Sequence, residues 1–355
     1  MTGRGKKTVL IIHNAVKAGG AKDKFRLESI AGVLDEVKAV AGALEELGIE
    51  FQTKSIEKIE QLPAILEKSR SQIVFNLVEE IEGAITDACL VPAICLAHKK
   101  ACTGSATPAL LLSQNKWQAK AVLAAANVVC PAGVVVYPGG GIELKNLPKG
   151  RYIVKPALTD ASEGIDSDSV VDVRGSALQK CVEKIHTQFG QPAIVEQFIS
   201  GKEINVSLVE RDGRAEVMPL AEIDFSAFSV GKPRIVGYRA KWLADSFEYN
   251  NTPRIIPADV SKKAAESIRR YAKEAWQAIG CSGYARVDFR LDEDENPFVL
   301  EVNPNPDISP DAGFPAAIAA GGITYCEFVK SILDNAIDNK LYPCYNNTLS
   351  EVIDV

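Results

Sequence analysis

The clearest hydrophobic pattern lies in the C-terminal third of the chain, where it predicts two apolar strands joined by an acidic turn. The first strand includes Arg286–Phe289 and the second includes Phe298–Asn303. Side chains alternate between the two faces of a strand, so Glu301 and Asn303 lie on the same face. Pairing of the two strands as a hairpin would bring Asp288 opposite them.

The N-terminal part of the chain predicts strands and helices in alternation. Apolar, β-branched residues indicate strands over 8–12, from Phe51 onward and over 73–77. Apolar residues at helical spacing predict helices over 27–47, ending at Gly48, and over 85–97. A β-α-β order of this kind is typical of a parallel sheet covered by helices. We expect this first domain to end at about residue 113.

The remainder of the chain predicts a mixture of both element types, without an internal repeat. The elements are a helix over 114–126, strands over 134–137 and 152–156, a helix near 176–190, a hairpin with strands over 193–199 and 203–209, and helices over 258–280 and about 324–338. We expect an N-terminal α/β domain over 1–113, a central subdomain over 114–192, a C-terminal subdomain with a metal site over 193–340, and a tail over 341–355.

Composition and charge exclude several classes of protein. The chain has 355 residues, of which 46% are hydrophobic and 24% are charged, as in ordinary globular proteins. Its net charge of −6 argues against a nucleic-acid binder. No apolar run reaches the roughly 20 residues that span a bilayer. The 8 cysteines form no Cys-x-x-Cys pair, which favours reduced thiols and a cytoplasmic location.

The candidate chemistry centres on a nucleotide and a metal ion. Two carboxylates and an amide oxygen, from Asp288, Glu301 and Asn303, suit Mg²⁺, which takes the rest of its ligands from phosphates and water. The chain contains no P-loop motif, so phosphates must be held in another way. Lys155 precedes a polar loop over 157–165 that can close over phosphates. The strand beginning at Ala193 ends with backbone groups that can bind an adenine edge.

The motifs, taken in order, resemble those of ATP-grasp enzymes and, within them, the D-alanine–D-alanine ligase family. The matching segments are Lys116, Val154–Pro156, Val195–Glu203, Arg286–Asp288 and Leu300–Pro304. The resemblance covers roughly residues 70–335 and extends more loosely over the N-terminal domain. It implies an α/β ATP-grasp fold of three subdomains, with a parallel α/β domain first and ATP between the central and C-terminal α+β subdomains.

The resemblance also implies roles for individual residues. For the base and sugar of ATP, the adenine hinge is formed by Glu196, Gln197, Phe198 and Ile199, its apolar floor by Leu300, and the ribose is held by Glu203. For the phosphates, the contacts come from Lys116 and Lys155, the covering loop includes Ser162 and Gly164, and Lys241 approaches the γ-phosphate. For catalysis, Arg286 stabilises the oxyanion, and two Mg²⁺ or Mn²⁺ ions are held by Asp288, Glu301 and Asn303.

The implied activity is the ATP-dependent joining of a carboxylate to an amine through an acylphosphate. The substrates are expected to be amino acids or small peptides, and the partners include neither nucleic acid nor membrane. Members of the family are often homodimers, and we expect the same here.

The chain departs from the family pattern where the substrates bind. Ala161 replaces the first serine of the phosphate loop, Trp242 replaces a tyrosine, Asp307 replaces a glycine, and Ala312 replaces a serine that holds the second substrate's carboxylate. These departures favour a ligase with different substrates. A divergent D-alanine–D-alanine ligase of cell-wall synthesis is the first alternative, and a small-molecule kinase or a non-catalytic ATP-binding protein on the same scaffold is the second.

Overall fold

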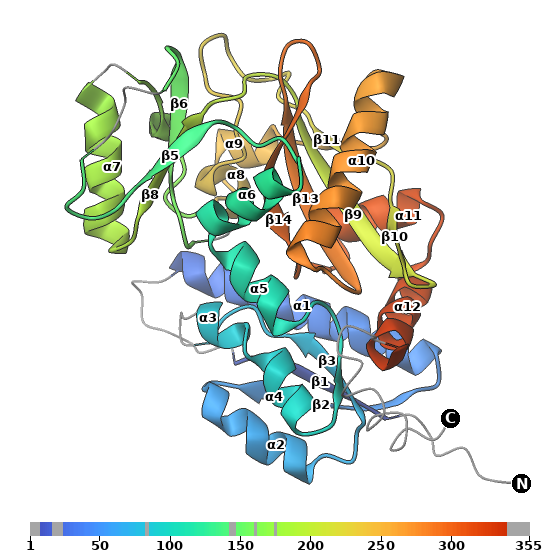
Figure 1. Cartoon of the computed structure of the whole chain (residues 1–355). Helices are drawn as coiled ribbons and strands as arrows, with labels where there is room; N and C mark the ends of the chain where they lie inside the picture. Colours follow the sequence, from blue (N-terminus) through green and yellow to red (C-terminus); the bar gives the residue numbers. More distant parts are fainter. Residues whose placement is uncertain are drawn as a thin grey trace, which may run out of the picture.

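The computed structural model describes residues 8–15, 24–81, 85–141, 147–159, 162–173 and 176–338, with the backbone alone at 24–31 and 338. The described chain forms three sheets, one in the lower half of Figure 1 and two in the upper half. Ala161 and the predicted tail over 341–355 lie outside the described residues.

The N-terminal domain is built on a parallel sheet, as the alternating pattern predicted. Its strands β1 (Thr8–Asn14), β2 (Glu50–Ile56), β3 (Ile73–Leu77) and β4 (Ala101–Cys102) lie in the order β2-β1-β3-β4. Helix α1 (Lys24–Glu46) packs on one face, and α2 (Leu62–Lys68) and α4 (Val91–Ala97) pack on the other. A short 3₁₀ turn (Ile59–Gln61) precedes α2, and α3 (Ile85–Ala88) precedes α4.

The helix expected over 114–126 proves to be α6 (Lys116–Ala125), preceded by a separate helix α5 (Thr107–Gln114). Asn115 separates the two, because its backbone is extended and its side chain accepts hydrogen bonds from the N–H groups of Trp117 and Gln118. Asparagine is a favoured N-cap residue, so it starts a new helix here. This cap sets the position of Lys116 at the first turn of α6.

The central sheet is small and antiparallel. Its strands β5 (Gly133–Val136), β6 (Arg151–Pro156), β7 (Val170–Asp172) and β8 (Ala193–Gln197) lie in the order β5-β8-β6-β7. Helix α7 (Ser176–Phe189) covers one face and buries Leu178, Val182 and Ile185 against it, as seen at the upper left of Figure 1. A 3₁₀ turn (Ser167–Ser169) precedes β7.

The C-terminal sheet is the largest of the three. Its strands are β9 (Glu203–Arg211), β10 (Arg214–Val217), β11 (Ala221–Ile223), β12 (Arg254–Ile255), β13 (Tyr284–Leu291) and β14 (Pro297–Asn303), in the order β12-β11-β9-β13-β14 with β10 beside β9. Helix α10 (Lys262–Ile279) packs on one face and ends, as predicted, at Gly280, which adopts a left-handed conformation. Two short helices, α8 (Tyr238–Trp242) and α9 (Phe247–Asn250), lie between β11 and β12.

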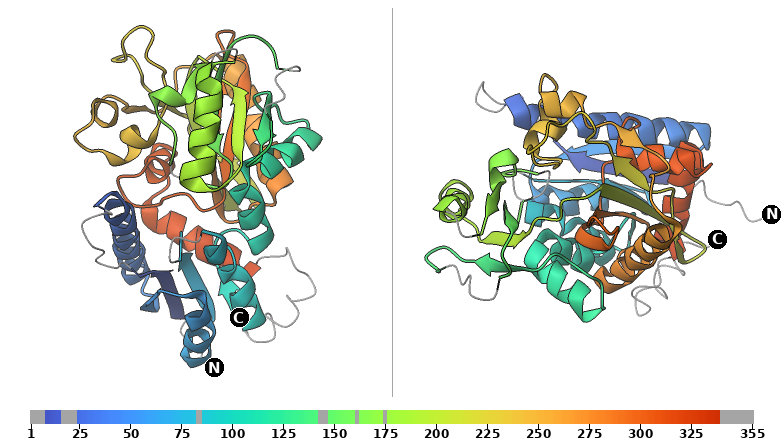
Figure 2. Two further views of the ribbon diagram at one scale, coloured as in Figure 1. Left: turned by 90° about the vertical axis from the view of Figure 1, so that its left-hand side faces the viewer. Right: turned by 90° about the horizontal axis from the view of Figure 1, so that it is seen from above.

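The last two helices return to the N-terminal domain. Helices α11 (Gly313–Ala320) and α12 (Tyr325–Asp338) share a core with α1, β1 and β3, which includes Phe75, Phe314 and Phe328. Figure 2 shows α12 (red) close to α1 (blue) in both views. The C-terminal end of the described chain therefore joins the part that carries the two antiparallel sheets to the first domain.

The predicted hairpin over 193–209 is wrong. Strand β8 pairs with β5 and β6 of the central sheet, whereas β9 pairs with β10, β11 and β13 of the C-terminal sheet. The chain crosses from one sheet to the other at Gly201, where a Cβ atom would come within 2.3 Å of the Leu291 carbonyl oxygen. The turn therefore passes directly over β13 instead of folding β9 back onto β8.

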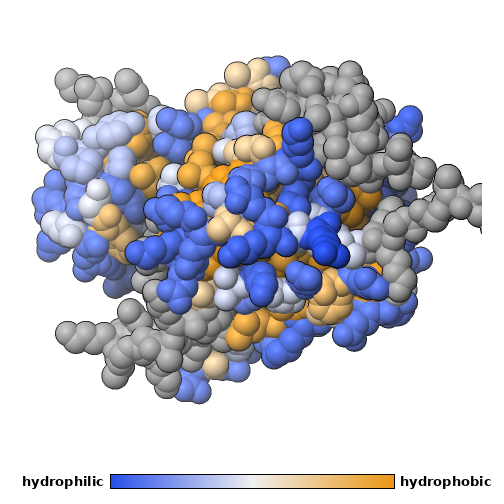
Figure 3. Space-filling model, turned by 90° about the horizontal axis from the view of Figure 1, so that it is seen from below, coloured by the Kyte–Doolittle hydropathy of each residue, from blue (hydrophilic) through white to orange (hydrophobic). Residues whose placement is uncertain are grey.

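Seen from below, on the side of the N-terminal domain, the surface is mainly hydrophilic, with apolar areas between the polar side chains (Figure 3). Within the described ranges, no single helix is long and apolar enough to cross a membrane; α11 and α12 meet that requirement only when taken together, across a bend of 102°.

Candidate active site

A cavity of about 1530 Å³ lies among the three sheets and receives nearly every residue that the sequence singled out. Of these, the cavity is lined by Lys116, Lys155, Ser162, Glu196, Gln197, Phe198, Ile199, Glu203, Lys241, Arg286, Asp288, Leu300, Glu301 and Asn303. Gly164 does not line it. One cavity thus collects side chains from positions 116 to 303, which belong to α6, to the central and C-terminal sheets and to the segments that connect their strands.

The predicted hairpin of β13 and β14 is confirmed, with Asp288 opposite Glu301 and Arg286 opposite Asn303. A β-bulge interrupts the register after Asp288, so that Leu300 has no partner on β13. A bulge changes the direction in which neighbouring side chains point. Leu300 and Glu301 are adjacent in sequence, yet both reach the cavity.

The oxygen donors on this hairpin fit a hard divalent cation. Asp288 and Glu301 supply carboxylates, and Asn303 supplies an amide oxygen, which is the ligand chemistry of Mg²⁺. In the described part of the chain, no group of three or more His, Cys, Asp or Glu side chains is placed to bind a metal. The set here has only two carboxylates, and a nucleotide would have to contribute further oxygens.

Arg286 is held against the first of these carboxylates. Its Nε and Nη2 atoms donate to the two oxygens of Asp288 at 2.7 and 2.8 Å, and Nη2 lies 4.0 Å from Glu301. Asn205 on β9 also donates to Asp288, at 2.8 Å. The carboxylate is therefore fixed by a bidentate guanidinium and an amide before any ligand arrives.

Buried lysines surround Glu196 at one end of the cavity. Glu196 lies 2.5 Å from the Nζ atom of Lys155 and 3.1 Å from that of Lys120, and all three residues are buried. Burial alone would raise the pKa of Glu196, but the two lysines outweigh it and hold that pKa below its usual range. Glu196 thus fixes the ammonium group of Lys155, which lines the cavity, and that of Lys120, which does not. Lys116 Nζ donates to the carbonyl of Thr159, within the loop over 157–165.

Cations from four separate segments converge on Glu301. Burial would raise its pKa, yet Lys116, Lys241, Arg286 and Lys155 together lower it to about 2. These groups come from α6, α8, β13 and β6. Positive charge from so many elements around one carboxylate is the environment that a polyphosphate and its metal ion require.

Arg290 on β13 is buried beside the segment that joins β8 to β9, and its side chain is the main hydrogen-bond donor there. The residue is 3% exposed. Its guanidinium donates to the carbonyls of Ile199, Gly201 and Arg234 at 3.0, 2.9 and 2.6 Å, and to Glu203 at 3.1 Å. Burial raises the pKa of Glu203 despite this contact. Arg290 therefore fastens the segment that joins β8 to β9 onto β13.

The described part of the phosphate loop is attached to the segment that follows β11. Ser162, whose φ of 60° is left-handed, donates its hydroxyl hydrogen to the Val236 carbonyl at 2.9 Å. The Tyr238 N–H donates to Ile165 at 2.9 Å. Gly164 has a φ of 72°, and a Cβ there would lie 2.9 Å from Phe189 on α7, so this glycine is required for packing behind the cavity.

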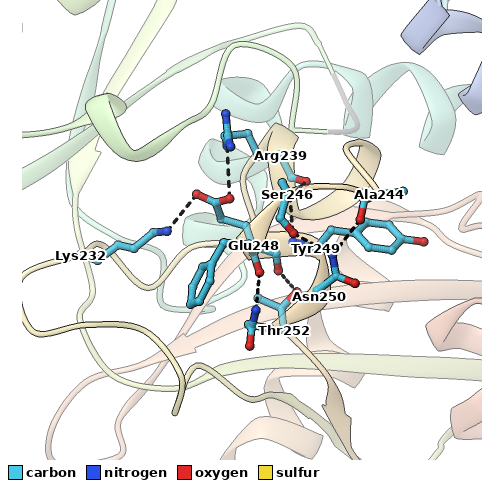
Figure 4. Close-up of polar contacts among 10 residues, drawn as sticks. Lys232, Arg239, Ala244, Ser246, Glu248, Tyr249, Asn250 and Thr252 are labelled. Carbon is cyan, nitrogen blue, oxygen red and sulfur yellow. Dashed lines mark hydrogen bonds and ion pairs between the residues drawn. The ribbon is translucent and has the colours of Figure 1, made fainter.

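Lys241 reaches the cavity from α8, which is braced by Glu248 (Figure 4). The Glu248 carboxylate lies 2.9 Å from Lys232 and 3.2 Å from Arg239, a neighbour of Lys241 on α8. Burial opposes the charged form, but these contacts and a backbone hydrogen bond lower the pKa of Glu248 to about 2. Lys232 also lies over the Phe247 ring, 4.4 Å from its centroid.

Three contributing residues were missed in the sequence: Lys120, Asn205 and Arg290. Each lies at a regular spacing from a predicted site residue. Lys120 is four positions after Lys116 on a helix, Asn205 is two positions after Glu203 on a strand, and Arg290 is two after Asp288. Those spacings place each pair on one face of its element. The spacing alone does not show that the faces meet in one cavity.

Comparison with known proteins identifies the family. Residues 146–334 match the sequence profile described as D-ala D-ala ligase C-terminus. A Sinorhizobium fredii protein called y4sG is 30% identical over 84% of this chain and 86% of its own length. The D-alanine–D-alanine ligase of Bordetella pertussis is also 30% identical, over 66% of this chain and 69% of its own.

Solved structures agree on the fold. D-alanine–D-alanine ligase from Bacillus anthracis, in a crystal structure complexed with ATP, superposes with a TM-score of 0.72 at 17% identity, covering 94% of this chain and 98% of its own. The enzyme from Coxiella burnetii gives 0.70 at 15% identity, covering 98% of each chain. These likenesses confirm the α/β ATP-grasp fold, and with the sequence matches they show that the chain belongs to the D-alanine–D-alanine ligase family.

Proposed function

We propose that the protein is an ATP- and Mg²⁺-dependent ligase that joins the carboxylate of one small amino-acid substrate to the amine of another. The observation that carries this proposal is the convergence of Lys116, Lys155, Lys241 and Arg286 on Glu301, beside Asp288. A carboxylate and a triphosphate repel each other, so a ligase must surround both with positive charge.

The residues of the cavity divide naturally between the two halves of ATP. Glu196, Gln197, Phe198 and Ile199, from β8 and the residues after it, would form the adenine hinge, although Glu196 is also paired with Lys155 and Lys120. Leu300 would form the apolar floor, and Glu203 would hold the ribose. Lys116 and Lys155 would bind the phosphates, with Ser162 and Gly164 in the loop that covers them. Asp288, Glu301 and Asn303 would hold two Mg²⁺ ions, which neutralise the phosphate oxygens when bound.

The reaction needs no nucleophile from the protein. The substrate carboxylate attacks the γ-phosphorus, ADP leaves, and an acylphosphate forms. The amine attacks the acyl carbon, inorganic phosphate leaves, and an amide remains. Lys241 would neutralise the transferred phosphoryl group. Arg286 would bind the oxyanion of the tetrahedral intermediate, and closure of the phosphate loop would exclude water.

The substrates are proposed to differ from two D-alanines. Trp242, Asp307 and Ala312, which depart from the family pattern, all line the cavity. The alternative is D-alanyl-D-alanine synthesis itself, which the names of the curated relatives favour. The deciding experiment measures phosphate release from Mg-ATP with a panel of D- and L-amino acids and dipeptides, and identifies the products by mass spectrometry.

Each result of that experiment has a definite meaning. A condensed product with ADP establishes the ligase and names its substrates. A phosphorylated small molecule without a new amide indicates a kinase instead. ATP binding without turnover across the whole panel would contradict the proposal and favour a non-catalytic ATP-binding protein. Homodimer formation also stays a prediction, which light scattering of the purified protein would test.

A further inference from the structure

The loop after β14 forms a compact, charged wall at the substrate end of the cavity. Asp307, Ser309, Asp311 and Ala312 all line the cavity here, as does Arg254 from β12. These positions include two of the departures from the family pattern, the aspartate at 307 and the alanine at 312. The wall therefore carries departures from the family pattern on the surface of the cavity itself.

Hydrogen bonds connect the residues of this wall to one another and to the elements behind it. The Ser309 N–H donates to the Asp307 carboxylate at 2.7 Å, and the Ala312 N–H donates to the Ser309 carbonyl at 2.9 Å. Behind the loop, the buried Glu36 carboxylate accepts the Ile308 N–H at 2.7 Å, and the Tyr325 hydroxyl donates to the Ile308 carbonyl at 3.1 Å. The Asp307 carboxylate is thus oriented before a substrate binds.

Ser309 offers an additional polar group at the same place. The residue is only 5% exposed, and it lines the cavity. Its hydroxyl makes no hydrogen bond to any other residue in the described ranges. The hydroxyl itself is not among the fully buried unpaired atoms, so it is accessible from the cavity to water or a ligand. Asp307 and Ser309 together present a carboxylate and a hydroxyl, which are acceptors suited to an ammonium group.

Arg254 supplies a positive charge beside Ala312, opposite in sign to that of Asp307. Its Nη1 atom donates to the Asp311 carbonyl at 3.0 Å, and its Nε atom lies 3.2 Å from the position that a Cβ on Gly313 would occupy. The guanidinium therefore lies over residues 311–313. A guanidinium has five N–H donors and binds carboxylates in a fork, so one backbone contact leaves several donors for a ligand.

We infer that Asp307, with Ser309, binds the ammonium group of the amine substrate and that Arg254 binds its carboxylate. The inference rests on the proposed ligase function and deepens it. The amine substrate is then a zwitterion, either an amino acid or a short peptide. Arg254 replaces the carboxylate-binding serine that the family has at position 312. Asp307 is also one of the carboxylates that raise the pKa of Arg286, after Asp288 and Glu301, so the ammonium would lie near the proposed oxyanion site.

The test compares substrates that differ only in the carboxylate. Amine-dependent phosphate release is measured with the D and L forms of alanine and of alaninamide. Arg254→Gln should raise the KM for alanine at least about tenfold, with kcat nearly unchanged, because uniform binding is lost. It should leave the KM for alaninamide unchanged. Arg269→Gln, an exposed arginine on α10, is the matched control and should change neither.

Asp307→Asn preserves the size of the side chain and an acceptor for the Ser309 N–H, and removes the charge that faces the cavity and the Glu36 carboxyl. It should raise the KM for alanine and for alaninamide alike, since both carry the ammonium. Equal effects of Arg254→Gln on alanine and alaninamide, or no effect of Asp307→Asn, would overturn the inference.

Ligand-detected NMR with Mg-ADP present separates this inference from the ligase proposal. Alanine binding that weakens in Arg254→Gln and Asp307→Asn supports the inference without turnover. Absence of alanine binding to the wild-type protein overturns it, and so does alanine binding that both variants retain in full. If binding behaves as expected but no amide forms with any carboxylate and ATP, the recognition stands and the proposed ligase function fails.

Discussion

At the scale of single residues, Glu301 is the carboxylate around which the cationic side chains of the cavity gather. It opposes Asp288 on the hairpin, and four cationic side chains lower its pKa to about 2. At neutral pH it is therefore ionised and ready to bind a cation. Its role depends on its charge, because an amide of the same shape cannot offset the surrounding lysines and arginine.

The first prediction concerns this charge. Glu301→Gln should lower kcat by more than about 100-fold, because a metal ligand is lost, while nucleotide affinity falls by less than about tenfold. Steady-state kinetics and calorimetric titration with ATP measure the two effects. Glu183→Gln, on the exposed side of α7, serves as the control. Normal turnover in Glu301→Gln would contradict the proposal that Glu301 binds Mg²⁺.

The second prediction concerns Arg286, which the structure shows paired with Asp288 at 2.7 Å. Arg286→Ala should lower kcat by about 10²–10³-fold, the usual effect of removing an oxyanion donor. ATP affinity should change little. Because Asp288 loses its guanidinium partner, Mg²⁺ affinity should rise, as measured by the Mg²⁺ dependence of ATP binding.

Arg286→Lys distinguishes the geometry of that side chain from its charge. Lysine retains the positive charge but cannot form the bidentate contact. It should recover the wild-type Mg²⁺ dependence more fully than it recovers kcat. An equal loss of ATP affinity and kcat in Arg286→Ala would contradict the oxyanion role.

At the scale of elements, the segment between β11 and β12 lines the cavity and is stabilised by ion pairs of its own. Glu248 joins Lys232 to Arg239, and Arg239 shares α8 with Lys241 (Figure 4). Phe225, Phe228 and Val236 form a small hydrophobic cluster within the same segment. The position of Lys241 therefore depends on an ion-pair arrangement outside the cavity.

The third prediction follows from the depressed pKa of Glu248. A carboxylate whose folded-state pKa is lowered stabilises the fold above its unfolded pKa, and that stability is lost as the pH falls toward the folded value of about 2. Glu248→Gln should therefore lower the free energy of unfolding by about 1–2 kcal/mol at pH 7. The difference from wild type should shrink between pH 4.5 and pH 2.

Urea unfolding of both proteins at pH 7 and pH 3 would measure this change. Glu248→Gln should also lower kcat more than it raises the KM for ATP, because Lys241 is less well positioned. Glu274→Gln breaks an exposed ion pair on α10 and provides the control. A pH-independent difference in stability would show that the Glu248 charge is not responsible.

At the scale of the whole molecule, the cavity exists because two antiparallel sheets meet around the β8–β9 connection. Arg290 and Gly201 fix that connection on β13. The relative position of the sheets, and hence the nucleotide site, depends on this close backbone contact.

The fourth prediction tests that contact. Gly201→Ala places a Cβ within 2.3 Å of the Leu291 carbonyl oxygen, so the connection must shift. The variant should lose about 1–3 kcal/mol of stability, as overpacked sites do, and its KM for ATP should rise. Gly213→Ala is the control, since its added Cβ meets nothing within 4 Å, although its φ of 68° carries some strain. Thermal unfolding and ATP kinetics of both variants decide the outcome.

Several features were available from the sequence because they depend on local periodicity and on side-chain chemistry. The spacing of Asp288, Glu301 and Asn303 predicted a hairpin with oxygen donors on one face, and the structure has that hairpin. The β-α-β pattern of the first domain, and the stops at Gly48 and Gly280, were predicted for the same reason. Strand alternation and helix stops are properties of the local chain.

Other features required the tertiary structure, because they join residues distant in sequence. Strict alternation would place Leu300 and Glu301 on opposite faces, and only the bulge allows both to reach the cavity. The assignment of β8 and β9 to different sheets depends on their partners and not on the turn between them. The sequence by itself indicated most of the groups proposed to carry the chemistry, though not Asn205 or Arg290, which also line the cavity. The tertiary structure decided which of them meet, because long-range packing alone brings Lys116, Lys241 and Arg286 around one carboxylate.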